Sequence, residues 1–260
     1  MADLARRSAE RELVVCDDLA KVSEAAAGEV ARAAREAVKS RGRFAIALAG
    51  GGTPRALYRL LAARHRADLP WDATHVFFGD ERCVPPDDAA SNFGMARAEL
   101  LSRVPIPVEQ VHRIRGELPA GEAARLYDAE LRRSFGGADA APGAVATFDV
   151  ALLGVGEDGH TASLFPGSEA LEERARWAVA AEAPPGTEVR ARVTVTLPVL
   201  RASRELCVLA AGEGKRGIVE EIFGGAPAPR DALPAALVAG TERTVWIIDR
   251  AAAGRFARAR

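Results

Sequence analysis

The chain has 260 residues, of which 48% are hydrophobic and 27% charged, and its formal net charge at pH 7 is −1. This composition supports one folded domain with a full core, and the near-zero charge gives no basic field of the kind that nucleic acids or anionic membranes attract. Cys16, Cys83 and Cys207 are far apart and form no CxxC pair, and no apolar stretch resembles a signal peptide or reaches the roughly 20 residues of a membrane helix. We therefore expect a soluble protein of the reducing cytoplasm.

The first predicted unit is a helix followed by a strand. Apolar residues recur at helical spacing over residues 20–40, and residues 44–49 form an apolar strand that runs into three glycines. Thr53 and Pro54 then fit the N-cap and the first position of a helix that extends to about residue 64.

The glycines before that helix, with Gly51, Gly52 and Thr53 nearest to it, form a candidate anion site. Free amides at a helix start attract anions, and glycine lets a phosphate approach the backbone. The pattern alone is equally compatible with a plain tight turn. It lacks the GK[ST] of a nucleotide P-loop and the GxGxxG spacing of a dinucleotide site, so a sugar phosphate is a better candidate than ATP or NAD.

A second strand over residues 75–79 ends at Asp80, Glu81 and Arg82. The carboxyl ends of parallel strands lie at one edge of a sheet, so these charges are predicted to lie beside the glycine loop. Ser91 and Asn92 are interpreted as residues that shape the loop or cap the next helix.

The remaining elements alternate between strand and helix patterns, which predicts a single domain over residues 1–260 with a doubly wound, mainly parallel sheet and helices on both faces. Loops are expected at 136–144 and 224–234. The predicted helices are 92–101, 122–135 and 215–223, and the predicted strands are 111–114, 150–155, 178–181, 193–197, 206–210 and 245–248.

The strand over 150–155 leads into a glycine-rich turn that carries Asp158 and His160. Near neutral pH an imidazole can take a proton from water and return it in a later step, as ester hydrolysis requires. A carboxylate two residues away is able to orient the ring, although the spacing does not by itself establish a hydrogen bond. The other histidines are interpreted as structural or exposed. Ser163 lacks a GxSxG setting, so no covalent nucleophile is predicted.

Lys215 and Arg192 are candidate contacts for an anion. Lys215 is one of only three lysines among 35 basic residues, and it lies between Gly214 and a predicted helix. A cation at a helix start is unfavourable unless an anion is present. A solvated surface lysine is the plainer alternative. Arg192 precedes the strand pattern VTV and ranks below Lys215.

GVGEDGHTASLFP at 154–166 resembles the motif of the family that contains 6-phosphogluconolactonases and glucosamine-6-phosphate deaminases and isomerases. Four further motifs agree in the order that this family shows: AGGGTP at 49–54, FFGDERCVPPDDAASN at 77–92, RVTVTLP at 192–198 and GEGK at 212–215. The resemblance covers nearly the whole chain and implies a Rossmann-like, sugar-phosphate isomerase type of fold.

Within the family, the resemblance favours hydrolysis of 6-phospho-D-glucono-1,5-lactone to 6-phosphogluconate, the second step of the oxidative pentose phosphate pathway. It implies that His160 is the general base and that Asp158 supports it. Arg82 is implied as a contact of the substrate anion, with Asp80 contacting hydroxyls or orienting other groups. Either Arg82 or backbone amides would stabilise the oxyanion. No metal or organic cofactor is expected, and the partner is a small sugar-phosphate lactone bound by a monomer or a small homo-oligomer.

Two other functions remain as alternatives. Glucosamine-6-phosphate deaminases resemble DGHIAFNEP, in which a glutamate precedes the proline, whereas this chain has Phe165 there. An apolar ring cannot relay a proton. A non-catalytic sugar-phosphate sensor is the third class, but the first 40 residues contain no helix-turn-helix pattern or basic cluster.

Overall fold

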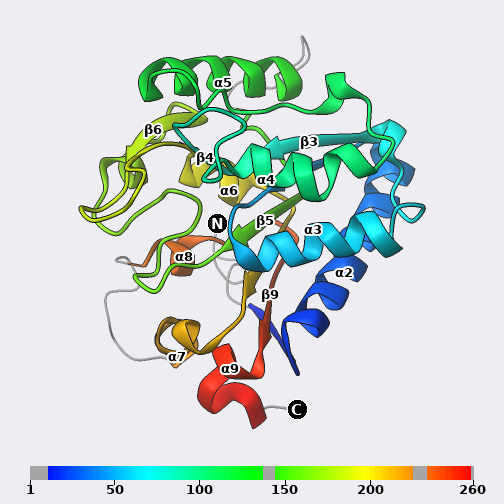
Figure 1. The fold of residues 1–260 in the computed structure, drawn as a ribbon, viewed down its shortest axis with the longest axis vertical. Coiled ribbons are helices and arrows are strands. Elements are labelled where there is room, and N and C mark those ends of the chain that lie inside the picture. Colours follow the sequence, from blue (N-terminus) through cyan, green and yellow to red (C-terminus); the bar gives the residue numbers. More distant parts are fainter. Residues whose placement is uncertain (1–10, 137–143, 225–232, 259–260) are drawn as a thin grey trace, which may run out of the picture.

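A computed structural model describes residues 11–136, 144–224 and 233–258. Its centre is a six-stranded sheet in which all neighbouring strands are parallel, in the order β1-β9-β8-β5-β2-β3 (Figure 1). The strands of this sheet are β1 (Glu12–Cys16), β2 (Phe44–Leu48), β3 (Thr74–Phe78), β5 (Val150–Gly154), β8 (Glu205–Ala210) and β9 (Arg243–Asp249).

The strand order reverses between β2 and β5. The chain runs outward from β2 to β3, then returns to β5 on the other side of β2 and continues outward through β8 and β9. Such a reversal leaves a crevice beyond the carboxyl ends of the two strands, which is where open α/β sheets bind ligands. The glycine loop follows β2 and the histidine turn follows β5, so the topology brings both predicted motifs to this crevice.

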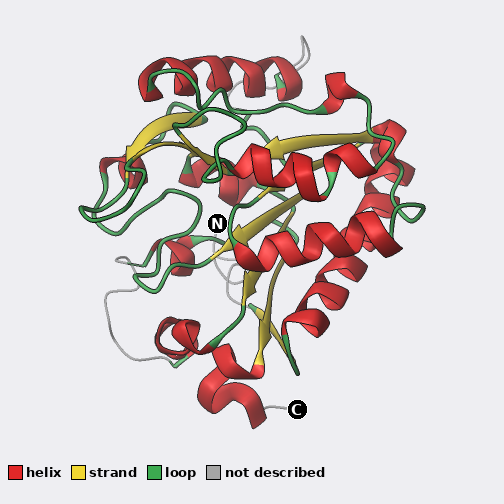
Figure 2. Cartoon of the chain, in the orientation of Figure 1, coloured by secondary structure: helices red, strands yellow, loops and turns green. Residues whose placement is uncertain are grey.

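Both central strands are apolar because both faces of the sheet are covered. Every residue of β2 is buried, as are the first four residues of β5. Figure 2 shows helices packed around the sheet strands. The α-helices are α2 (Leu19–Arg41), α3 (Gly52–Arg64), α4 (Asn92–Glu99), α5 (Ala120–Phe135), α6 (Leu197–Ala202), α7 (Arg216–Phe223), α8 (Pro234–Leu237) and α9 (Arg250–Ala253).

A second, antiparallel sheet was not predicted. It has the order β4-β7-β6 and consists of β4 (Asp80–Arg82), β6 (Ala178–Glu182) and β7 (Ala191–Val195). The predicted strands at 178–181 and 193–197 belong to this sheet and not to the parallel one. Gly79 joins the two sheets, because its amide donates to Leu48 O at 2.9 Å while its carbonyl accepts from Val195 N at 2.9 Å.

Several predicted boundaries were wrong. The short edge strand β1 was missed, and residues 111–114 form only a single bridge between Val111 and Val76. Helix α3 begins at Gly52 with Gly51 as its N-cap, so Thr53 is not the cap. Pro54 still lies in the first turn, where a missing N–H costs no intrahelical hydrogen bond. The loops predicted at 136–144 and 224–234 lie mostly outside the described residues, as do residues 1–10.

None of the described helices is both long enough and apolar enough to cross a lipid bilayer.

Candidate active site

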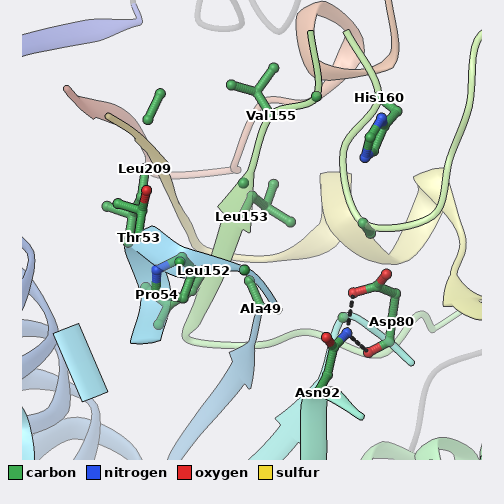
Figure 3. A pocket seen from close by; sticks show the side chains of 18 of the residues that line it. Ala49, Thr53, Pro54, Asp80, Asn92, Leu152, Leu153, Val155, His160 and Leu209 are labelled. Atoms are coloured by element: carbon green, nitrogen blue, oxygen red, sulfur yellow. Dashed lines mark hydrogen bonds between the residues drawn. The ribbon is translucent and has the colours of Figure 1, made fainter. Parts of the chain in front are cut away.

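A pocket of about 230 Å³ lies at the strand reversal, beyond the ends of β2, β5 and β8. In Figure 3, Thr53 and Pro54 lie on one side of the pocket and His160 on the other, with Leu153 and Val155 between them. Eight of the nine predicted site residues line this pocket, namely Gly51, Gly52, Thr53, Asp80, Arg82, His160, Arg192 and Lys215. The ninth, Asp158, contacts the pocket through His160.

The glycine loop presents the start of α3 to the pocket. The first amides of a helix have no intrahelical partner, and the helix dipole adds positive potential there. Gly51 has φ 101°, a left-handed value that glycine adopts without strain. A Cβ on Gly50 would lie 2.0 Å from Oδ1 of Asn92. The loop therefore lies against Asn92, and no side chain caps the start of α3, so its first amides can bind an anion.

The histidine turn holds His160 and Asp158 in direct contact. Nδ1 of His160 lies 2.5 Å from Oδ1 of Asp158, and the same oxygen accepts the backbone amide of His160 at 3.1 Å. A carboxylate accepts hydrogen bonds, so this contact places a proton on Nδ1, and in the neutral ring the lone pair is then on Nε2. A Cβ at Gly156 would lie 2.1 Å from Nδ1 of His160, so only glycine leaves room for the imidazole ring in this position. This geometry suits a general base that acts through Nε2.

The conformation of the turn is held by contacts beyond the catalytic pair. Ala162, which lines the pocket, has φ 50°, a left-handed value that is unfavourable for a residue with a Cβ. Next to it, Thr161 Oγ1 donates to Gly154 O at 2.8 Å and anchors the turn to the end of β5. The Phe165 ring lies 4.7 Å from the His160 ring, centroid to centroid.

Asp80 connects three segments of the pocket wall. Its carboxylate accepts from Ser163 Oγ at 2.7 Å and from Asn92 Nδ2 at 3.1 Å, and the latter bond is drawn in Figure 3. Asp80 and Ser163 are both buried. The serine hydroxyl thus donates to a carboxylate, and Ser163 is not among the residues that line the pocket.

Glu81 is structural and lies outside the pocket lining. Its two carboxylate oxygens accept the amides of Asn92 and Phe93 at 2.7 Å each, at the start of α4. Burial raises the pKa of Glu81, and these backbone donors partly oppose that effect. Ser91 is the N-cap of the same helix and accepts from Gly94 N at 2.9 Å, which confirms its predicted role.

Arg82 and Arg192 lie directly opposite each other in the antiparallel sheet. Arg82 Nη1 donates to Ala90 O at 2.7 Å, while Arg192 Nε donates to Val189 O at 2.9 Å. Burial lowers the pKa of Arg192, and the charge of Arg82 lowers it further. Like charges placed opposite each other repel, and the nearby carboxylates of Asp80 and Glu81 offset part of that repulsion at Arg192. Both arginines line the pocket, so the pair supplies positive charge to a site that can bind an anion.

Lys215 reaches the pocket from the segment after β8, where it is the N-cap of α7. The preceding turn is tied to the end of β9, because Gly212 N donates to the Asp249 carboxylate at about 3.0 Å. Within the described parts of the chain no carboxylate forms an ion pair with Lys215. Its charge is thus available to a ligand.

The other three histidines lie away from the pocket. His65 contacts Asp68 on the surface, and His112 lies between His75 Nδ1 at 3.1 Å and Glu130 Oε1 at 2.7 Å. Burial lowers the pKa of His112 to about 4. Both ring nitrogens of His112 are engaged in these contacts, as expected of a structural histidine.

The sequence did not identify two residues that shape the pocket, Asn92 and Ala162. The sequence indicates Asn92 only as a loop or cap residue, and nothing in it marks Ala162 as left-handed. The described residues contain no group of three or more His, Cys, Asp or Glu side chains arranged to hold a metal ion.

Comparisons with known proteins show which family the chain resembles over most of its length. Residues 17–246 match the model of the family described as glucosamine-6-phosphate isomerases/6-phosphogluconolactonase. A 6-phosphogluconolactonase of Nostoc sp. is 41% identical over 219 residues, covering 83% of this chain and 86% of that protein. The Homo sapiens 6-phosphogluconolactonase is 42% identical over 217 residues, covering 82% and 81%. The solved structure of the 6-phosphogluconolactonase from Trypanosoma cruzi superposes with a TM-score of 0.82 at 30% identity, covering 95% of this chain and 97% of that one.

Proposed function

Because the chain belongs to the glucosamine-6-phosphate isomerase/6-phosphogluconolactonase family, we propose that it hydrolyses 6-phospho-D-glucono-1,5-lactone to 6-phosphogluconate, the second step of the oxidative pentose phosphate pathway. One observation carries the proposal: the His160–Asp158 pair faces the same pocket as the glycine loop and three cationic side chains. A proton acceptor and an anion site within one pocket are what hydrolysis of a phosphorylated lactone requires.

The phosphate binds at the glycine loop. Amides at the start of α3 from Gly52 and Thr53 donate to its oxygens, Gly51 gives the backbone room to approach, and Lys215 supplies an unpaired charge. Arg82 assists from the second sheet. Two protein donors fix the position of the Asp80 carboxylate. Its remaining lone pairs accept hydrogen bonds from hydroxyl groups of the substrate.

His160 activates water by general-base catalysis. Its Nε2 accepts a proton as the water oxygen attacks the lactone carbonyl, and the resulting imidazolium is stabilised by Asp158 at Nδ1. Arg82 and Arg192 place positive charge in the pocket in which the carbonyl oxygen becomes an oxyanion. His160 then returns the proton to the ring oxygen as the carbon–oxygen bond breaks, which gives the open-chain acid.

The structure also explains why amino-sugar ring opening is the weaker alternative. Phe165 packs its ring at 4.7 Å from the His160 ring, at the position where deaminases have a glutamate. An aromatic ring there leaves Asp158 as the carboxylate that contacts His160, and it provides no second proton carrier.

The cell compartment and partners follow from the same chemistry. We place the enzyme in the cytoplasm, because Cys16, Cys83 and Cys207 are all free thiols. Its partner is a small sugar-phosphate lactone, and it acts as a monomer or a small homo-oligomer.

The proposal is tested by two substrates. Freshly generated lactone is expected to be hydrolysed well above its spontaneous rate, with 6-phosphogluconate measured by an NADP-dependent dehydrogenase. Glucosamine 6-phosphate is expected to release no ammonia above the blank. A lactone rate equal to the blank, together with ammonia release, would replace the lactonase assignment by the deaminase one.

A further inference from the structure

A buried tyrosine of α3 holds the backbone directly before the glycine loop. The Tyr58 hydroxyl donates to Ala49 O at 2.8 Å and accepts from Ala49 N at 2.9 Å. Tyr58 has no exposed surface, and burial raises its pKa, so the hydroxyl stays protonated and makes both bonds at once. Ala49 is the residue that follows the end of β2 and is itself 8% exposed.

Besides this contact, Gly50 of the loop packs against the side chain of Asn92. Gly51, the N-cap of α3, makes no side-chain capping bond, and the three glycines contribute no side chains. The hydroxyl therefore ties the strand before the loop to the helix after it, and closes the segment from Ala49 to Tyr58 into a ring.

The neighbouring strand ends in the same way. Tyr127 of α5, also buried, donates to Phe78 O at 2.9 Å and accepts from Phe78 N at 2.9 Å. Phe78 is the last residue of β3 and leads through Gly79 to Asp80. At the end of each strand, one tyrosine hydroxyl thus bonds both the amide and the carbonyl of a single buried residue, Ala49 after β2 and Phe78 in β3. These buried backbone groups therefore need no water partner.

We propose that Tyr58 is a positioning residue of the phosphate-binding loop, acting through Ala49 to hold the amides of Gly52 and Thr53 where they receive the phosphate; this inference rests on the proposed function of that loop. Without the hydroxyl, both backbone groups of Ala49 lose their buried partner and the loop shifts to find others. The loss falls on phosphate binding and spares the chemistry at His160.

The test compares Tyr58→Phe with Thr74→Val, which serves as a matched control. Thr74 is also fully buried, and its hydroxyl donates to Pro70 O at 2.7 Å at the opposite edge of the sheet. Tyr58→Phe is expected to raise KM for the lactone and the dissociation constant of inorganic phosphate about tenfold each, with kcat changed by less than about threefold. Thr74→Val is expected to lower the thermal midpoint and to leave KM and phosphate binding unchanged.

The outcomes separate this inference from the proposed function. If the wild type hydrolyses the lactone and Tyr58→Phe has the same KM and phosphate affinity, the role of Tyr58 is overturned and the proposed function stands. If the wild type binds phosphate in a way that depends on Tyr58 but has no lactonase activity, the role of Tyr58 is supported and the proposed activity is refuted. If the wild type neither binds phosphate nor hydrolyses the lactone, both proposals are overturned. If Tyr58→Phe fails to fold, hydrogen exchange of the wild type decides: the Ala49 amide is expected to be as protected as the Ile46 amide, and rapid exchange would overturn the inference.

Discussion

Replacing Asp158 by asparagine tests whether the carboxylate supports His160 electrostatically. The asparagine oxygen can still accept from the ring and backbone nitrogens of His160, so these two hydrogen bonds can be retained while the negative charge is lost. Two unit charges 4 Å apart interact by about 1 kcal/mol in water and about 4 kcal/mol near a protein surface. Asp158 is 43% exposed and His160 34% exposed, so solvent screens the pair. We therefore assign about 1–2 kcal/mol to the stabilisation of the imidazolium.

This magnitude predicts a fall in kcat of about 5–30-fold for Asp158→Asn. Asp158→Ala is expected to cost about a hundredfold or more, because the ring also loses its orientation. Steady-state hydrolysis of the lactone measures both variants, with Glu157→Gln as the control because it removes the neighbouring exposed acid of the same turn. If Asp158→Asn keeps kcat within about twofold of the wild type, or falls no further than Glu157→Gln, the supporting role of Asp158 is refuted.

Three further predictions concern the phosphate, the turn and the pH dependence of stability. Lys215→Met is expected to raise KM about tenfold or more with little change in kcat. The control Lys39→Met, on an exposed helix end, is expected to leave both constants unchanged, and equal effects of the two substitutions would contradict a role of Lys215 in phosphate binding. Ala162→Gly is expected to raise the free energy of unfolding by about 0.5–1 kcal/mol, and Ala162→Val to lower it by about 1–3 kcal/mol, both measured by urea unfolding. Ala162→Gly is also expected to lower kcat in the lactonase assay. The pKa of His112, lowered to about 4 by burial, makes protonation unfavourable in the folded state, so stability is present above pH 6.5 and is lost as the pH falls toward 4. The Glu130 carboxylate, 2.7 Å from Nδ1 of His112, opposes part of this shift, so urea unfolding is expected to show a loss of about 1–2 kcal/mol between pH 8 and 5. His112→Phe is expected to remove most of this loss, and an unchanged pH slope in the variant would contradict the assignment.

The parts of the site that the sequence predicts are those encoded within a few residues. The glycine loop, the Asp158–His160 turn and Lys215 each follow an apolar strand or precede a helix, and their placement at one sheet edge follows from parallel topology. Local pattern was therefore sufficient to place these three segments at one pocket.

The parts that the sequence did not predict depend on long-range pairing. Ser163 donates to Asp80 across 83 residues of chain, and β4 pairs with β7 across more than 100. Neither partner carries a local signal of the other, so the antiparallel sheet and the carboxylate network were missed. Thr53 was misassigned as a cap because its residue type fits, whereas the left-handed φ of Gly51 starts the helix two residues earlier.

The central claim is that His160 is the base of a lactone hydrolase. The most direct test is the initial rate of 6-phosphogluconate formation from fresh lactone with wild type, His160→Ala and no enzyme, at saturating substrate. We predict a wild-type rate well above the spontaneous one and a fall of about 10²–10⁴-fold in kcat for His160→Ala, with the affinity for inorganic phosphate retained. A His160→Ala variant that hydrolyses the lactone as fast as the wild type would contradict the account.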